Sequence, residues 1–246
     1  MHNRFIIVCF LLILSLQGAA QSYIGIHGGF SASKTSFGDP TYKDNYRDRP
    51  KLGYHLGVDA QFKATGKFSL YVAPGYAKRG VSIKSLDEMQ VKNRLTYSYL
   101  ETPILLQYSL FRSPYTPIFE FGPRISYWLG GKGKVRSLEM EQPFDLPYRL
   151  RFKEMDGYEQ LHVEGSARVQ FGLIFGAGWS YDFRNGQKVM VIARYELGGT
   201  YHSSLDRNPF RYLSYYEHSF RHKNNTLSVT ASWLMNVENV RKRLTK

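Results

Sequence analysis

The sequence contains a single cysteine, Cys9, close to its N-terminus. Cys9 lies inside an apolar segment that has the features of a secretory signal, so removal of that segment leaves a mature chain with no thiol. A chain of that kind forms no disulfide and offers no thiolate to zinc. Cys9 is also not at the expected cleavage point, so no lipoprotein anchor is indicated.

Long apolar runs are equally scarce. Beyond the N-terminus there is no span of about 20 apolar residues, which is the length that a transmembrane helix requires. The N-terminal stretch "MHNRFIIVCFLLILSLQGAAQS" combines a positive start at Arg4, a short apolar run and small residues before the expected cleavage after Ala20. We expect a signal peptide at 1–20, a folded domain at 21–237 and a basic periplasmic tail at 238–246.

Acidic residues are in deficit. The chain has 33 Lys and Arg against 20 Asp and Glu, a formal charge of +13. It has no helical basic region and no RNA- or DNA-binding motif, so we expect no nucleic-acid partner. The positive charge is better suited to acidic lipid headgroups or glycans.

What the sequence has in abundance is alternation. In "ARVQFGLIFGAGWSYDF", residues 167–183, one set of alternate residues is aliphatic or aromatic and the other is charged, polar or glycine. A period of two predicts a β-strand, because successive side chains point to opposite faces. The same pattern predicts eight strands, which are Ser22–Ser33, Lys51–Ala64, Phe68–Lys84, Arg94–Leu110, Pro117–Gly131, Arg168–Phe183, Gln187–His202 and Lys223–Val237.

The connections between these strands alternate between long and short. Three are tight, and one of them contains Asn185-Gly186, a dipeptide that favours a hairpin turn. The long ones are 34–50, 85–93, 132–167 and 203–222. This rhythm predicts an all-β fold: an eight-stranded antiparallel up-and-down transmembrane β-barrel with short periplasmic turns and long extracellular loops. The alternative is a secreted barrel of the lipocalin type, with the apolar face inside.

The position of glycine favours the membrane barrel. Most strand glycines fall on the polar face, where they suit the narrow, strongly curved lumen of eight strands. The other face has aliphatic residues in mid-strand and aromatic residues near the ends, as a lipid-facing wall does. We expect interfacial aromatics at two rims, the periplasmic one with Tyr181, Phe183 and Trp233 and the outer one with Tyr54, Tyr76 and Tyr195. This places the chain in the outer membrane of a Gram-negative bacterium.

Charged residues in mid-strand are expected to point into the lumen. They are Asp59, Glu101, Glu120, Arg124, Arg194 and Glu196. Buried charges persist when they are paired and hydrogen-bonded, so we expect a polar network that plugs the barrel. A narrow pore for protons or solutes is the functional alternative.

The chemical motifs are weak. His202 and Ser204 at the end of the seventh strand resemble the His-x-Ser pair of outer-membrane lipid A deacylases, but Leu205 stands where that family has asparagine. Catalysis by this pair, with His202 as the base, remains the enzymatic alternative to a non-enzymatic barrel. His27 and His55 lack a third ligand, so we expect no metal and no cofactor. The "GGKGKVR" segment lacks phosphate-loop spacing and is expected to begin a loop.

Taken in order, several segments resemble the PorT-like outer-membrane β-barrel proteins of Bacteroidota. They are "YIGIHGGFSAS", "GYHLGVDAQF", "YSYLETPILLQYSL", "FEFGPRISYWLGG", "FGLIFGAGWSY" and "ARYELGGTYHSS". The resemblance implies an eight-stranded barrel with an occluded interior, and one branch of the family assists protein secretion and gliding machinery. The basic ending "ENVRKRLTK" departs from barrels that end on an aromatic residue.

We therefore expect a barrel that presents loops for binding or assists an envelope or secretion complex. The expected partners are outer-membrane lipids and lipopolysaccharide, the barrel-assembly machinery and envelope or secretion-complex proteins, with the loop at 208–223 as a contact surface. In the long connection at 132–167, the fifth and sixth strands are expected to continue as a hairpin. We expect "EQPFDLP" near its tip or bend, and Val163 would extend the sixth strand. The alternative is a disordered loop.

Overall fold

The computed structural model describes residues 22–37, 45–86, 91–111, 113–137, 144–153, 160–205 and 220–238. The expected signal peptide, most of the basic tail and the loop residues 208–219 lie outside these ranges. Within them, no helix has both the length and the apolar character that crossing a membrane requires.

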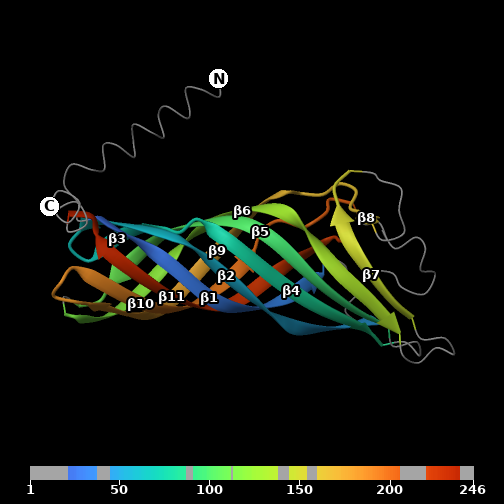
Figure 1. Ribbon diagram of the computed structural model, residues 1–246, viewed down its shortest axis with the longest axis horizontal. Coiled ribbons are helices and arrows are strands. Elements are labelled where there is room, and N and C mark those ends of the chain that lie inside the picture. The colour runs from blue at the N-terminus through green and yellow to red at the C-terminus, as the bar shows by residue number, and fades with distance from the viewer. Residues whose placement is uncertain are drawn as a thin grey trace, which may run out of the picture.

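The described chain consists of β-strands that form one sheet (Figure 1). The strands are β1 (Ser22–Phe37), β2 (Tyr46–Thr65), β3 (Phe68–Val72), β4 (Gly75–Ser85), β5 (Lys92–Ser109), β6 (Tyr115–Ser137), β7 (Phe144–Arg151), β8 (Gln160–His162), β9 (Val169–Asp182), β10 (Gln187–Gly198) and β11 (His222–Asn236).

The sheet closes into a ring of eight antiparallel crossings. β3 and β4 together make the third crossing, because each of them pairs with β2 on one side and β5 on the other. The ring continues through β6, β9, β10 and β11, and β11 pairs with β1 along almost its whole length. The predicted eight-stranded barrel is therefore confirmed. β7 and β8 stand outside the ring, at the end opposite the start of β1 and the end of β11 (Figure 1).

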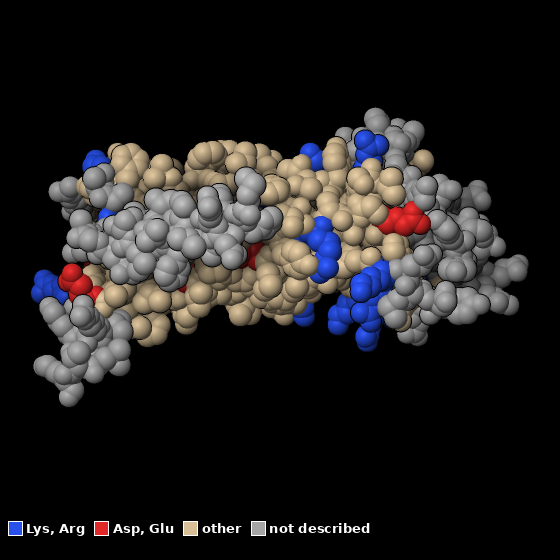
Figure 2. All heavy atoms as spheres, turned by 90° about the horizontal axis from the view of Figure 1, so that it is seen from above, with Lys and Arg blue, Asp and Glu red and all other residues tan. Residues whose placement is uncertain are grey.

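The alternation of the sequence becomes an alternation of exposure. In β9, Phe175 is 45% exposed whereas its neighbour Ile174 is 1% exposed. Large apolar side chains cover the outer wall of the barrel in the same way on every crossing. Where grey atoms do not cover it, the middle of the molecule in Figure 2 is mostly tan, and Lys and Arg lie toward the two ends. Among the expected rim aromatics, Tyr54, Phe183, Tyr195 and Trp233 are exposed on this wall, and Tyr76 and Tyr181 are half-buried.

Glycine on the inner face makes room for lumenal side chains. A Cβ on Gly29 would lie 2.6 Å from Cε1 of His55, and a Cβ on Gly57 would lie 2.6 Å from Cε1 of His27. The two imidazole rings occupy the space that side chains at these positions would need. Glycine at these positions thus leaves the narrow interior to side chains from neighbouring strands.

The outer end of the barrel is more ordered than the sequence predicted. β1 continues to Phe37 and β2 begins at Tyr46, so much of the expected loop at 34–50 is strand. The expectation that "GGKGKVR" begins a loop is wrong, because β6 continues through it to Ser137. The strand ladder to β5 supplies backbone hydrogen bonds there, which local sequence cannot reveal.

The predicted hairpin exists, but one of its arms differs. β6 forms the first arm, and it pairs with β7 from Ser137 opposite Phe144 to Gly131 opposite Leu150. The second arm is therefore a separate strand and not a continuation of the sixth crossing, which begins only at Val169. Val163 does not extend that crossing either. Its N–H donates to the carbonyl of Arg151, and its side chain is buried in an apolar cluster that includes Tyr148 and Leu150 of β7.

Candidate functional site

The lumen contains a stack of ion pairs in mid-barrel. The pair nearer the periplasmic end joins Arg194 of β10 to Glu120 of β6 through the guanidinium Nε and a carboxylate oxygen. Gln107 of β5 donates to the other carboxylate oxygen at 2.9 Å. Both charged side chains are almost fully buried, so each depends on the other for its neutralisation.

A four-membered network lies next toward the outer end. Arg79 of β4 contacts Glu101 and Glu196 at 2.6 Å each. Arg124 of β6 contacts Glu196 at 2.5 Å and lies 3.9 Å from Glu101. Two arginines thus bridge two glutamates that come from β5 and β10, so the network ties together four separate crossings of the ring.

The sixth expected lumenal charge has a different environment. Asp59 accepts from the hydroxyl of Tyr71 at 2.7 Å, and its same oxygen is 2.7 Å from Nδ1 of His27. His55, beside His27, is 2.9 Å from the hydroxyl of Thr230. Within the described residues, no group of three or more His, Cys, Asp or Glu is arranged to hold a metal ion.

The lumen is less polar than the sequence analysis expected. Toward the periplasmic end, the inward side chains form an apolar cluster: Tyr23, Tyr71, Ala73, Leu105, Ile118, Ile174, Met190, Ile192 and Leu234. In this part of the barrel strand parity indicates correctly which residues point inward, but not that a narrow barrel must pack them against each other. Apolar groups fill this space without any need for hydrogen-bond partners.

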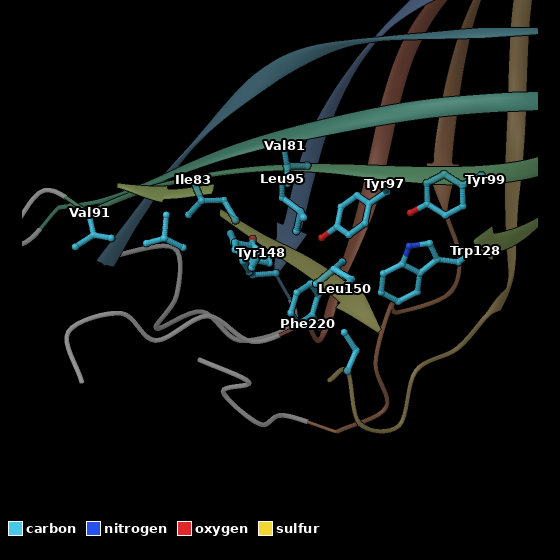
Figure 3. Close-up of a cluster of buried hydrophobic side chains, with 13 residues drawn as sticks. Val81, Ile83, Val91, Leu95, Tyr97, Tyr99, Trp128, Tyr148, Leu150 and Phe220 are labelled. Carbon is cyan, nitrogen blue, oxygen red and sulfur yellow. The ribbon is translucent and has the colours of Figure 1, made fainter. Parts of the chain in front are cut away.

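Above the ion pairs, a second apolar cluster caps the lumen. It combines barrel residues with β7 and with Phe220, which precedes β11, and Tyr97, Trp128, Tyr148 and Leu150 are among its other buried members (Figure 3). β7 therefore contributes part of the lid: Tyr148 lies over Gly133 and donates to Asn93 at 2.8 Å. Beneath the cap, the cavity beside Arg79 is about 10 Å³, which is the space of a single water molecule.

His202 is part of this cap. Its Nδ1 lies 2.9 Å from the carbonyl of His222, and since a carbonyl can only accept, Nδ1 carries the proton. Its Nε2, 2.6 Å from the hydroxyl of Tyr99, is then the acceptor. His202 is 1% exposed, and burial together with the nearby His222 holds its pKa well below the usual range. The imidazole is neutral, and both of its nitrogens are occupied.

Ser204 is arranged as a loop residue. Its hydroxyl donates to the carbonyl of Gly165 at 3.3 Å, and its backbone N–H donates to the same carbonyl at 3.0 Å. Acyl transfer requires the base to accept the proton of the nucleophile. The atom of His202 that could accept it is directed at Tyr99 instead.

The main lumenal residue that the site prediction left out is Arg79. It lies on the polar face of the third predicted strand, so the parity signal that identified Arg124 was also present for Arg79. The capping residues Tyr97 and Trp128 were harder to find. Their partners on β7 come from a loop whose path back onto the barrel is not encoded in strand parity.

Two comparisons place this architecture among known proteins. A model of the outer membrane protein beta-barrel domain matches residues 19–198, most of the chain. The chain belongs to this family. It follows from the family that the protein lies in the outer membrane of a Gram-negative bacterium, as the sequence predicted. No curated protein matches.

The chain is similar to several solved structures of outer-membrane proteins. The attachment invasion locus protein Ail of Yersinia pestis has 12% identity over 87% of this chain and 99% of its own, with a TM-score of 0.37. OprG of Pseudomonas aeruginosa has 13% identity over 88% and 94%, with a TM-score of 0.41. The outer membrane enzyme PagL has 13% identity over 85% and 99%, with a TM-score of 0.33. These likenesses do not distinguish enzymes from other barrels.

Proposed function

We propose that this protein is a non-enzymatic outer-membrane barrel with a closed lumen, whose outer end is a binding platform for another component of the cell envelope. The observation that carries the proposal is the combination of plug and cap. Buried ion pairs cross the lumen, and the cluster around Trp128 covers them. A chain that seals its own interior leaves its outer surface as the place where it acts.

The same geometry argues against the pore. Passage of a solute would require the contacts of Arg79 and Arg124 with their glutamates to open while the cap above them moved aside. Each of these charges loses its neutralising partner in that movement, which is costly in a buried site. Planar-bilayer recordings of the purified protein are expected to show no discrete conductance. Discrete conductance steps in the wild-type protein that persist in Tyr148→Ala would indicate a channel.

The enzymatic alternative has a direct test. Lipid A from cells with and without the protein is compared by mass spectrometry, alongside the variants His202→Ala and Ser204→Ala. We expect the same lipid A masses in all four samples. Loss of an acyl chain that requires both side chains would overturn the non-enzymatic proposal.

A finer assignment rests on the resemblance to PorT-like proteins: an accessory role in an envelope or secretion complex. The extension of β6 and β7 beyond the ring supports it, because it provides a rigid surface outside the membrane. Cross-linking on intact cells followed by affinity capture tests this role, with wild type compared with Tyr148→Ala, which loosens β7. A partner captured by wild type and lost in the variant is expected, and equal capture by both would exclude the β6–β7 surface.

A further inference from the structure

The outer wall changes character abruptly at one level of the barrel. A cross-strand row of outward positions runs through Leu56, Tyr76, Leu100 and Tyr127, which are partners of one another on β2, β4, β5 and β6. Two rows farther out, the corresponding row consists of Lys51, Gly80, Thr96, Lys132 and Arg149. The step between the two rows is about 13 Å along the tilted strands.

Two β-bulges produce this change. In β2, the pairing with β4 shifts between Lys51 and Tyr54, so one extra residue is accommodated. In β6, the pairing with β5 shifts opposite Ser98 and Tyr99, where Leu129 is the extra residue. A bulge reverses which residues of a strand point outward. Without the one in β6, Lys132 would point toward the lumen.

The outward positions beyond the bulges form a basic wall on β2, β4, β5, β6 and β7. We define it by Lys51, Lys78, Arg94, Lys132, Arg149 and Arg151, which line two adjoining hollows of about 440 and 540 Å³. Thr96, Lys132 and Arg149 border both hollows. Lysine and arginine gather toward this end of the molecule in Figure 2.

The charges of the basic wall are not neutralised within the described chain. Three outward rows lie beyond the bulges, and they start on β2 at Lys51, Arg49 and Arg47. Asp145 is the single carboxylate in these rows, and it is paired with Lys134 at 2.5 Å. Lys51 instead donates to the hydroxyl of Thr96 at 2.8 Å, with its stem lying across Gly80. Partial burial, with Arg94 and Lys132 nearby, lowers the pKa of Lys51. Like charges held together in this way are stabilised when an anion binds.

We infer that the basic wall binds the phosphate groups of lipid A in the outer leaflet. The inference goes beyond the proposed function, because it names a lipid that contacts the side of the barrel. The cations lie directly above the apolar wall and face sideways, so a lipid whose acyl chains cover Leu56 and Leu100 brings its headgroup into the hollows. Arginine and lysine are the side chains that bind phosphate best.

The experiment measures lipid retention by native mass spectrometry of the full mature protein, folded in uncharged detergent. The probes are bisphosphorylated lipid A, the same lipid A without phosphates, and heparin as a soluble polyanion. The test variant carries Lys51→Gln, Lys132→Gln and Arg149→Gln. The matched control carries Lys63→Gln, Lys67→Gln and Arg184→Gln, an equal charge change at the other end of the barrel. Heat-modifiable gel mobility verifies that both variants are folded.

Wild type is expected to prefer bisphosphorylated lipid A to the dephosphorylated form. The test variant should bind it at least about tenfold more weakly, because each basic residue near an anionic surface contributes about fivefold. The control should stay within about twofold of wild type. Equal retention by test variant and wild type overturns the inference, and so does heparin binding through the wall without any preference for phosphorylated lipid A. A change in the mass of the bound lipid A would contradict the non-enzymatic function instead, so the two failures are distinguishable.

Discussion

One carboxylate, Glu120, holds two sides of the lumen together. It neutralises Arg194 and accepts from Gln107, and it is buried. We predict that Glu120→Gln destabilises the barrel by about 3–5 kcal/mol, because it leaves a buried guanidinium without its counter-charge. Urea unfolding of the protein in micelles, followed by tryptophan fluorescence, measures the change.

The double variant Glu120→Gln/Arg194→Gln is the control for this pair. It removes both charges, so it should cost much less than the sum of the single changes. Additive losses would show that the two side chains do not depend on each other. Arg124→Gln should likewise be costly, since Glu196 then keeps only Arg79.

On the opposite face, a single residue tests the assignment of the membrane. Phe175 is 45% exposed in mid-strand, and Phe183 is 41% exposed just beyond the end of β9. We predict that Phe175→Arg costs about 2–4 kcal/mol, whereas Phe183→Arg costs about 0–1 kcal/mol, because the penalty for a charge falls toward the interface. Refolding into lipid vesicles measures both. Equal costs at the two positions would place the membrane elsewhere on this wall.

At the scale of elements, β7 is held to β6 by one row of backbone pairing and by the packing of Tyr148 into the cap. Trypsin sites lie along both strands, including Lys134, Arg149 and Arg151. We predict that the folded protein is cut slowly at these sites, and that Tyr148→Ala makes Arg149 and Arg151 susceptible. Peptide mapping by mass spectrometry gives the positions. Rapid cutting of wild type at Arg149 would contradict the hairpin.

The outer part of β6 also shows where sequence reasoning stopped short. Strand parity followed Phe119 to Leu129 correctly, but Leu129 is the extra residue of a bulge, and the parity of everything beyond it is reversed. Lysine and glycine still alternate at Lys132 and Gly133, so the period of two continues, but the pattern alone does not say which of the two faces out. Pairing with β5 decides it, and that partner is remote in sequence.

For the whole molecule, the number of crossings, their direction and, as far as the two bulges, their inside-outside parity could be predicted, because each follows from local alternation and loop length. All six expected lumenal charges lie in the interior for the same reason. Which arginine meets which glutamate could not be predicted. Glu196 pairs with Arg124 across 72 residues of sequence, and the stagger of the closed ring sets that meeting. The cap depends in addition on how β7 folds back.

The pairing of β1 with β11 closes the ring, and this closure has a direct test. Gly28 lies opposite Ala231, both on the lipid face. Directly opposed residues have Cα atoms about 4.5–5.5 Å apart, within the range of a disulfide. We predict that Gly28→Cys/Ala231→Cys oxidises readily in the folded protein produced without residues 1–20, which has no other cysteine. The product is a cyclised chain with altered mobility on a non-reducing gel.

The pair Gly28→Cys/Val229→Cys is the matched control. Val229 lies on the same face but opposite Phe30, so its Cα is about 7–8 Å from that of Gly28 and cross-linking should be slow. Faster oxidation of this control than of the matched pair would reveal a register slipped by two residues. Such a slip would also separate Ser33 from Thr226, whose hydroxyls are 3.0 Å apart across the same seam. If neither pair oxidised while both variants kept the heat-modifiable mobility of a folded barrel, the ring would be open between its first and last strands.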